Sequence, residues 1–193
     1  MGKYKVSNGL KKSYVAKVGK SGYEGVKELG ELNQISVDIT ENSTSYYAGN
    51  RKVIVDKSLS KIEGSLEIPS LTKELEILLF GRSESENGEV IKGAWDQAPY
   101  FALQFEQTSK DDETGEEVTD YITLYRVQFQ QTGITGKSKE DNPSFAGITL
   151  KFEALTLEDG TYMSIVSSDD TEITEDFKTN WGKTVTTPKK KSI

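Results

Sequence analysis

The side chains that could do chemistry in this sequence are carboxylates, because the chain contains neither histidine nor cysteine. Without these two residue types, Ser-His-Asp and Cys-His nucleophile systems cannot form, and neither can Cys/His zinc, haem or iron–sulfur sites. Acidic residues crowd two segments: Asp111, Asp112, Glu113, Glu116, Glu117 and Asp120 in the first, and Asp169, Asp170, Glu172, Glu175 and Asp176 in the second. Their spacing fits no EF-hand loop. We expect solvated turns there, with calcium binding as the alternative.

A pair of carboxyl groups in an aromatic cleft could hydrolyse glycosides, if the two groups lie about 5–10 Å apart. The acids that adjoin an aromatic residue are Asp96, next to Trp95, and Asp120, next to Tyr121. No motif singles out either pair, and no glycine-rich phosphate loop lies between a buried strand and a helix. We therefore expect a structural or binding protein, with no catalytic site and no cofactor.

Alternation of apolar and polar residues governs most of the chain. A period of two with one polar face predicts antiparallel strands that bury one side. Such strands are expected at residues 11–18, 34–40, 61–68, 100–107 and 147–154. Residues 118–130 are apolar on both faces at their centre, as in a central strand, and 52–55 form a short apolar run. The composition of Asp159-Gly160 is typical of a tight hairpin turn into residues 162–166.

One segment follows a helical period instead. Ser70 is placed to cap a helix, and Gly81 follows its last apolar residue. The apolar side chains between them fall on one face: Leu71, Leu75, Leu78 and Leu79. A weaker helix is expected at 174–181. Together these elements predict one mainly β domain over residues 1–193, an antiparallel β-sandwich or partly closed barrel with one flanking α-helix at about 70–80.

Charge is unevenly distributed along the chain. Residues 1–27 carry a net charge of +6 and residues 183–193 carry +4, whereas the remaining body carries −17. The basic N-terminal arm (about 1–9) and C-terminal tail (about 183–193) are either solvated ends or arms that lie on the acidic surface of a neighbouring copy. The arm contacts would come from Lys3, Lys5, Lys189, Lys190 and Lys191. No apolar run has the length of a signal peptide or a membrane span.

Polar stretches at 41–50 and 108–117 are expected to be long loops. Tyr46 and Tyr47 lie side by side in the first of them. Tyrosine is enriched at protein interfaces, so this pair is expected either to contact another molecule or to cover the edge of the domain's own core.

The order of several segments resembles the major tail protein, or tail tube protein, of long non-contractile-tailed phages that infect Gram-positive bacteria. The resemblance extends over nearly the whole chain and lies in the order and spacing of its segments, none of which is a catalytic signature. Those segments are residues 9–17, 35–38, 47–49, 66–69, 78–81, 98–106, 124–129, 137–141 and 147–155.

The resemblance implies subunits that form hexameric rings, which stack into a hollow tube for genome delivery in the virion tail after assembly in the host cytoplasm. It implies tape measure, tail terminator and distal tail proteins as partners, passing double-stranded DNA without specific binding, and no membrane. It also implies that the stretch after an early strand reaches the next ring, with Tyr46, Tyr47, Asn50 and Arg51 as candidates.

A polar or acidic lumen would let DNA slide, whereas a basic one would bind it through counterion release. The polar faces of the two clearest strands supply Asp38, Glu63 and Glu67 as candidates for the lining. The alternative function is a secreted or surface β-sandwich module for adhesion or carbohydrate binding.

Overall fold

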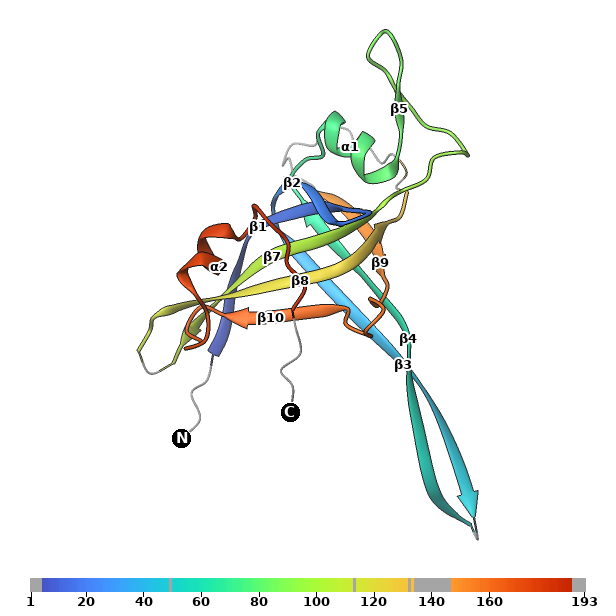
Figure 1. Ribbon diagram of the computed structural model, residues 1–193, viewed down its shortest axis with the longest axis vertical. Helices are drawn as coiled ribbons and strands as arrows, with labels where there is room; N and C mark the ends of the chain where they lie inside the picture. Colours follow the sequence, from blue (N-terminus) through green and yellow to red (C-terminus); the bar gives the residue numbers. More distant parts are fainter. Residues whose placement is uncertain (1–4, 49, 113, 132, 134–146, 189–193) are drawn as a thin grey trace, which may run out of the picture.

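The computed structural model describes residues 5–48, 50–112, 114–131, 133 and 147–188. Figure 1 shows its strands and helices, which in chain order are β1 (Lys5–Gly19), β2 (Gly22–Glu31), β3 (Gln34–Ala48), β4 (Arg51–Ile68), α1 (Lys73–Phe80), β5 (Ser83–Glu84), β6 (Val90–Ile91), β7 (Tyr100–Asp111), β8 (Glu117–Phe129), β9 (Ile148–Ala154), β10 (Met163–Ser167) and α2 (Glu175–Asn180).

One antiparallel sheet contains eight of the strands, in the order β2-β1-β7-β8-β9-β4-β3, with β10 also paired to β8. Strand β8 is shared between two neighbours, because Val127–Phe129 pair with β9 and Asp120–Leu124 pair with β10. The sheet bends so that its two halves enclose one core. The described strands do not close into a barrel, and β2 and β3 remain as its outer edges. The predicted mainly β, sandwich-like fold is confirmed.

Alternation decides which side chains enter that core. In β4 the buried residues are Ile62, Leu66 and Ile68, with the polar residues between them on the other face. Strand β9 buries Leu150 and Phe152 in the same way. Burying a large apolar side chain contributes about 1.5–3 kcal/mol, so these alternating positions fix the register of each strand.

Strands β7 and β8 are buried on both faces because the C-terminal segment covers their outer side. The ring of Tyr121 on β8 packs against Trp181, with 4.9 Å between centroids, and against Phe177, with 5.9 Å. Helix α2 carries Phe177 and ends just before Trp181. The predicted second helix is therefore present, and it explains why residues 118–130 are apolar on both sides.

Helix α1 begins two residues later than Ser70 predicts. Thr72 is the N-cap, and its Oγ1 accepts a hydrogen bond from the backbone N–H of Leu75 at 3.3 Å. Gly81 ends the helix in the left-handed region with φ 65°, as its sequence position predicts. A Cβ at this position would collide with the carbonyl oxygen of Gln97, so glycine is required here on two grounds.

Three other expectations are corrected. The stretch 41–50 is part of a long β3–β4 hairpin, because its backbone groups pair across the two strands. The predicted loop at 108–117 is shorter, since β7 runs to Asp111 and β8 begins at Glu117. The turn at Asp159-Gly160 does not join a hairpin of adjacent strands, because β10 pairs with β8 and not with β9.

Candidate assembly surfaces

The β3–β4 hairpin extends far beyond the body of the domain, as Figure 1 shows. A register shift between Thr40 and Glu41 marks the point where it leaves the sheet. Beyond it, residues 41–48 and 50–59 form the projecting hairpin, in which every described residue is exposed except the partly buried Ser45. A two-stranded hairpin without a packed face is at best marginally stable in water. Its length therefore points to a surface that supports it from outside the chain.

The projecting hairpin also carries an unusual share of the exposed apolar side chains. Tyr46 and Ile54 lie directly opposite each other, with 64% and 58% of their surface exposed. The other large apolar side chains exposed on it are Tyr47, Val53, Val55 and Leu59. Exposed apolar groups gathered on one element mark interaction sites, whereas scattered ones do not.

The predicted inter-ring residues gather at the far end of the projecting hairpin. Tyr46 and Tyr47 lie on β3, Arg51 begins β4, and Asn50 lies between them with φ 56°. The tyrosines do not cover the edge of the core, because both are exposed and distant from it along the strand. The sequence prediction of a loop is wrong here, because these residues end and begin paired strands. Their contact with the next ring stays a prediction.

Two of the predicted lumen residues face each other on the outer side of the sheet. Asp38 on β3 lies opposite Glu63 on β4, and Glu63 in turn lies opposite Glu153 on β9. Glu67 lies on the same face of β4, four residues further on, and accepts a hydrogen bond from the side-chain amide of Asn33 at 3.4 Å. The face is thus a row of three carboxylates across three strands, with a fourth beside it.

Carboxylates directly opposite one another repel and destabilise a sheet. Lys61 reduces this repulsion, since its Nζ lies 2.5 Å from Glu63 and 3.5 Å from Glu153. The hydrogen bond to Glu63 raises the pKa of Lys61, which keeps the ammonium charged. Gln130 also donates to Glu153 at 3.0 Å. We refer to this surface, centred on the row of Asp38, Glu63 and Glu153, as the acidic face.

Glu153 is a member of the acidic face that the sequence reasoning did not select. The alternation of residues 147–154 places it on the polar side of its strand, but only the pairing of β4 with β9 places it beside Glu63. The pattern of a single strand does not show which residues lie opposite it in the sheet. The sequence therefore indicated that Glu153 lies on the polar face, but not that it lies beside Glu63.

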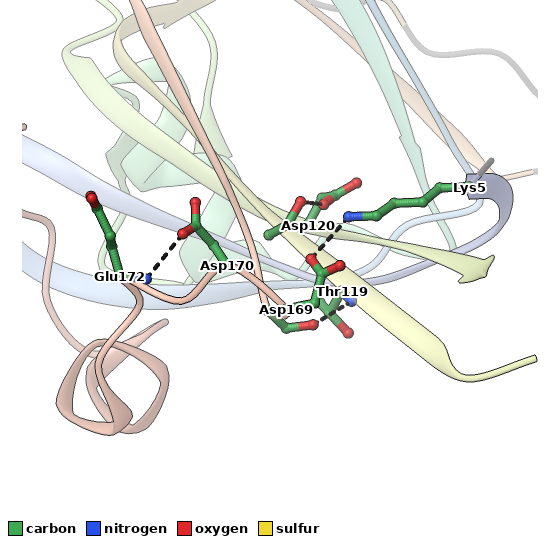
Figure 2. Close-up of polar contacts among 8 residues, drawn as sticks. Lys5, Thr119, Asp120, Asp169, Asp170 and Glu172 are labelled. Atoms are coloured by element: carbon green, nitrogen blue, oxygen red, sulfur yellow. Dashed lines mark hydrogen bonds and ion pairs between the residues drawn. The ribbon is translucent and has the colours of Figure 1, made fainter. Parts of the chain in front are cut away.

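The basic N-terminal arm is shorter than predicted. Residues 5–9 belong to β1, and Lys5 pairs with Asp111 across the sheet. The Nζ of Lys5 lies 2.9 Å from Asp169, as Figure 2 shows. This hydrogen bond raises the pKa of Lys5. Lys5 therefore forms an ion pair within its own chain, and its contact with a neighbouring copy stays a prediction. The other predicted arm contacts lie outside the described residues: Lys3, Lys189, Lys190 and Lys191.

The two acidic segments of the sequence meet in space. Pairing of β10 with β8 places Ser167 opposite Asp120, and the Ser167 hydroxyl donates to that carboxylate (Figure 2). Asp170 accepts from the backbone N–H of Glu172 at 3.0 Å. In the part of the chain that the structure describes, no three acidic side chains are grouped to hold a metal ion. The solvated-turn interpretation is correct only in part, because Asp111 is buried at the end of β7 and Glu117 and Asp120 belong to β8.

The two aromatic–acid pairs lie in different surroundings. The side chain of Asp96 is fully buried and accepts from the backbone N–H of Gly93 at 3.0 Å, whereas Trp95 points outward with 71% of its surface exposed. Tyr121 lies under Phe177 and Trp181.

The two ends of the strand order complete the candidate surfaces. Among the described strands, β2 pairs only with β1 and β3 pairs only with β4, so each presents a row of unpaired backbone groups along its other side. Exposed edges of this kind are templates for pairing with another chain.

The sequence matches no family model, and it matches no curated protein. No helix among the described residues is long and apolar enough to cross a membrane.

Proposed function

We propose that this chain is the subunit of a phage tail tube, a non-enzymatic protein that self-assembles into stacked hexameric rings around a conduit for genome delivery. The observation that carries the proposal is the projecting hairpin, on which Tyr46, Ile54 and their apolar neighbours are exposed and not covered by any other described part of the chain. A contact with a second copy would bury these side chains. In this proposal the hairpin meets a different surface of the neighbouring copy, so the contact is heterologous, and repeated heterologous contacts build rings or open filaments.

The two free edges support ring formation. Strands β2 and β3 lie at opposite ends of the strand order, so the β2 edge of one copy can pair with the β3 edge of the next. Such pairing would satisfy the exposed backbone groups and close a ring by rotation. The projecting hairpin is then left to join one ring to another.

The acidic face supplies a lining that suits passing DNA. Duplex DNA carries about one negative charge per 1.7 Å of its axis, so a row of carboxylates would repel it and oppose binding. In this proposal Asp38, Glu63, Glu67 and Glu153 face the lumen. The subunit would assemble in the host cytoplasm, become part of the virion tail, and contact tape measure, tail terminator and distal tail proteins.

The test compares the purified chain with a variant that lacks the projecting hairpin. Thr40 and Lys61 are cross-strand partners, so an Asn-Gly turn can replace residues 41–60 and join the two strands directly. We expect the full chain to form tubes visible by electron microscopy, and the variant to remain folded but unassembled. A full chain that stays monomeric at high concentration would contradict the proposal, and so would tubes formed equally well by the shortened chain.

A further inference from the structure

A second projection lies at the opposite end of the molecule's long axis from the projecting hairpin (Figure 1). It consists of residues 83–96, which follow α1 and include the short strands β5 and β6. Ser83 pairs with Ile91 and Glu84 with Val90, so the projection is itself a small hairpin followed by a turn. We call it the distal turn. The distal turn belongs neither to the projecting hairpin, nor to the β2 and β3 edges, nor to the acidic face.

Trp95 is the most exposed large apolar side chain of the distal turn, at 71%. Its indole packs over Gly93 so closely that a Cβ there would collide with the ring. Two hydrogen bonds close this turn, from the Asp96 N–H to the Gly93 carbonyl at 3.2 Å and from the Gly93 N–H to the Asp96 carboxylate at 3.0 Å. The tryptophan is therefore exposed but held in place.

Buried charges anchor the turn to the body. The side chains of Arg82 and Asp96 are 1% and 0% exposed, with Nε and Oδ2 4.0 Å apart. Arg82 also pairs with Glu76 on α1, to which Lys92 binds from the other side at 2.9 Å. Ordering Trp95 before it meets a partner lowers the entropic cost of binding. Tryptophan, tyrosine and arginine are the residue types that most often dominate interface energies.

The two ends of the molecule carry opposite charge. Residues 83–91 hold Glu84, Glu86 and Glu89 and no basic residue, whereas residues 46–54 hold Arg51 and Lys52 and no acid. Of these five charged residues, only Glu84 forms an ion pair with another described residue, Lys73, at 2.5 Å. Glu89 accepts a hydrogen bond from the Ser85 hydroxyl at 3.1 Å. Complementary charges on two surfaces that meet provide steering and register.

We propose that the distal turn is the docking site for the tip of the projecting hairpin of a second copy of this chain. Tyr46 and Tyr47 pack against Trp95, while Arg51 and Lys52 meet Glu86 and Glu89. The contact deepens the tube proposal, on which its place between stacked rings rests. The head-to-tail contact itself requires only two copies, because the surfaces lie at opposite ends of one chain and differ from each other.

Cross-linking tests the contact directly, since the chain has no cysteine of its own. Ala48→Cys protein is mixed with Ala94→Cys protein, so that Tyr47 and Trp95 are retained, and treated with a short bis-maleimide linker; both positions are exposed. We expect a cross-linked heterodimer several-fold more abundant than with Thr161→Cys, which places the thiol in the turn that leads to β10. Equal yields from the two mixtures would overturn the docking proposal.

Charge exchange provides a second test that does not depend on a thiol. Arg51→Glu/Lys52→Glu protein and Glu86→Lys/Glu89→Lys protein should each need a concentration about tenfold or more above that of the native chain to assemble. Mixing the two should restore assembly, because each acidic tip then meets a basic turn. Native-like assembly of Glu86→Lys/Glu89→Lys alone would refute the contact.

The two tests separate this inference from the tube proposal. A cross-link between residues 48 and 94 in a protein that never forms tubes would support the docking site and refute the tube. Tubes that form without that cross-link would support the tube proposal and refute the docking site.

Discussion

Tyr46 and Ile54 lie opposite each other on the projecting hairpin, and both are more than half exposed. Cross-strand pairs of an aromatic and a β-branched residue stabilise a sheet when they are shielded from water. This pair lies further along the hairpin than Ile62, the buried residue of β4 nearest to it. No described element of the chain packs on either face of the pair. Its full stabilisation becomes available only when a second surface covers the hairpin.

Replacing the tyrosines should therefore affect assembly and not folding. In Tyr46→Ser/Tyr47→Ser we expect no tubes at concentrations where the native chain forms them, and a free energy of unfolding within about 0.5 kcal/mol per substitution of the native value. Pelleting and urea denaturation measure the two quantities. Ile165→Ser is the matched control, since Ile165 is a comparably exposed apolar residue on β10. Loss of assembly in that control would show that the effect is not specific to the hairpin.

The acidic face should keep the tubes from binding DNA. Asp38→Lys/Glu63→Lys/Glu67→Lys should leave tubes intact, and it should raise their binding to DNA by about tenfold or more at low salt, with the gain lost as salt increases. Co-sedimentation of DNA with tubes measures this. In the phage, the same variant should reduce genome delivery, and unchanged infectivity would refute the assignment of this face to the lumen.

The control for the DNA experiment changes the same number of charges elsewhere. Glu158→Lys/Glu175→Lys/Asp176→Lys alters exposed acids away from the sheet face. If its tubes bind DNA as strongly as those of the acidic-face variant, net charge alone accounts for the binding.

The buried pair of Arg82 and Asp96 should contribute to the stability of the fold. Asp96→Ala leaves the Arg82 guanidinium buried without one of its two acidic partners, and we expect a loss of about 3 kcal/mol in the free energy of unfolding. Glu86→Ala, which removes an exposed acid of the same distal turn, should change it by less than about 0.5 kcal/mol. Urea denaturation distinguishes the two, and equal effects would show that burial of Asp96 does not matter.

Glu106 gives the fold a dependence on pH. Burial raises the pKa of this carboxyl, with the nearby charge of Lys11 opposing the change. The folded chain therefore retains a proton at pH values where the unfolded chain has lost it. As the pH rises from the ordinary glutamate pKa through the folded value, the free energy of unfolding should fall.

Glu106→Gln removes this titration. The variant should be more stable than the native chain at neutral pH, and the difference should vanish below the ordinary glutamate pKa. Glu117 is the matched control, because a hydrogen bond from Lys11 lowers the pKa of its exposed carboxyl. Glu117→Gln should therefore change stability with the opposite sign. A gain from Glu106→Gln that persists unchanged at low pH would contradict the titration.

Elements with one buried face were predictable from the sequence. The alternation around Ile62 and Leu66 gives β4 its core face, and Gly81 marks the end of α1. The start of α1 was misplaced because Ser70 and Thr72 both carry a hydroxyl that can cap a helix. Only the structure shows that Thr72 accepts the bond from Leu75.

The candidate surfaces were only partly predictable, for physical reasons. A strand with neither face buried needs no alternation, so the polar run before Tyr46 resembled a loop although its backbone is paired throughout. The row from Asp38 through Glu63 to Glu153 depends on the register of the β3–β4 hairpin and on its pairing with β9, which is distant in sequence. Trp95 is held in place through the buried side chain of Asp96. Aspartate is rarely buried, so nothing in the sequence indicated this burial.

A cryo-electron microscopy reconstruction of the assembled protein tests the central claim most directly, because it locates the projecting hairpin. We predict stacked six-fold rings in which the hairpin of each subunit enters the adjoining ring and Asp38, Glu63 and Glu153 face a central channel. Assemblies in which the hairpin remains in solvent, or a protein that yields no assemblies at all, would contradict the account.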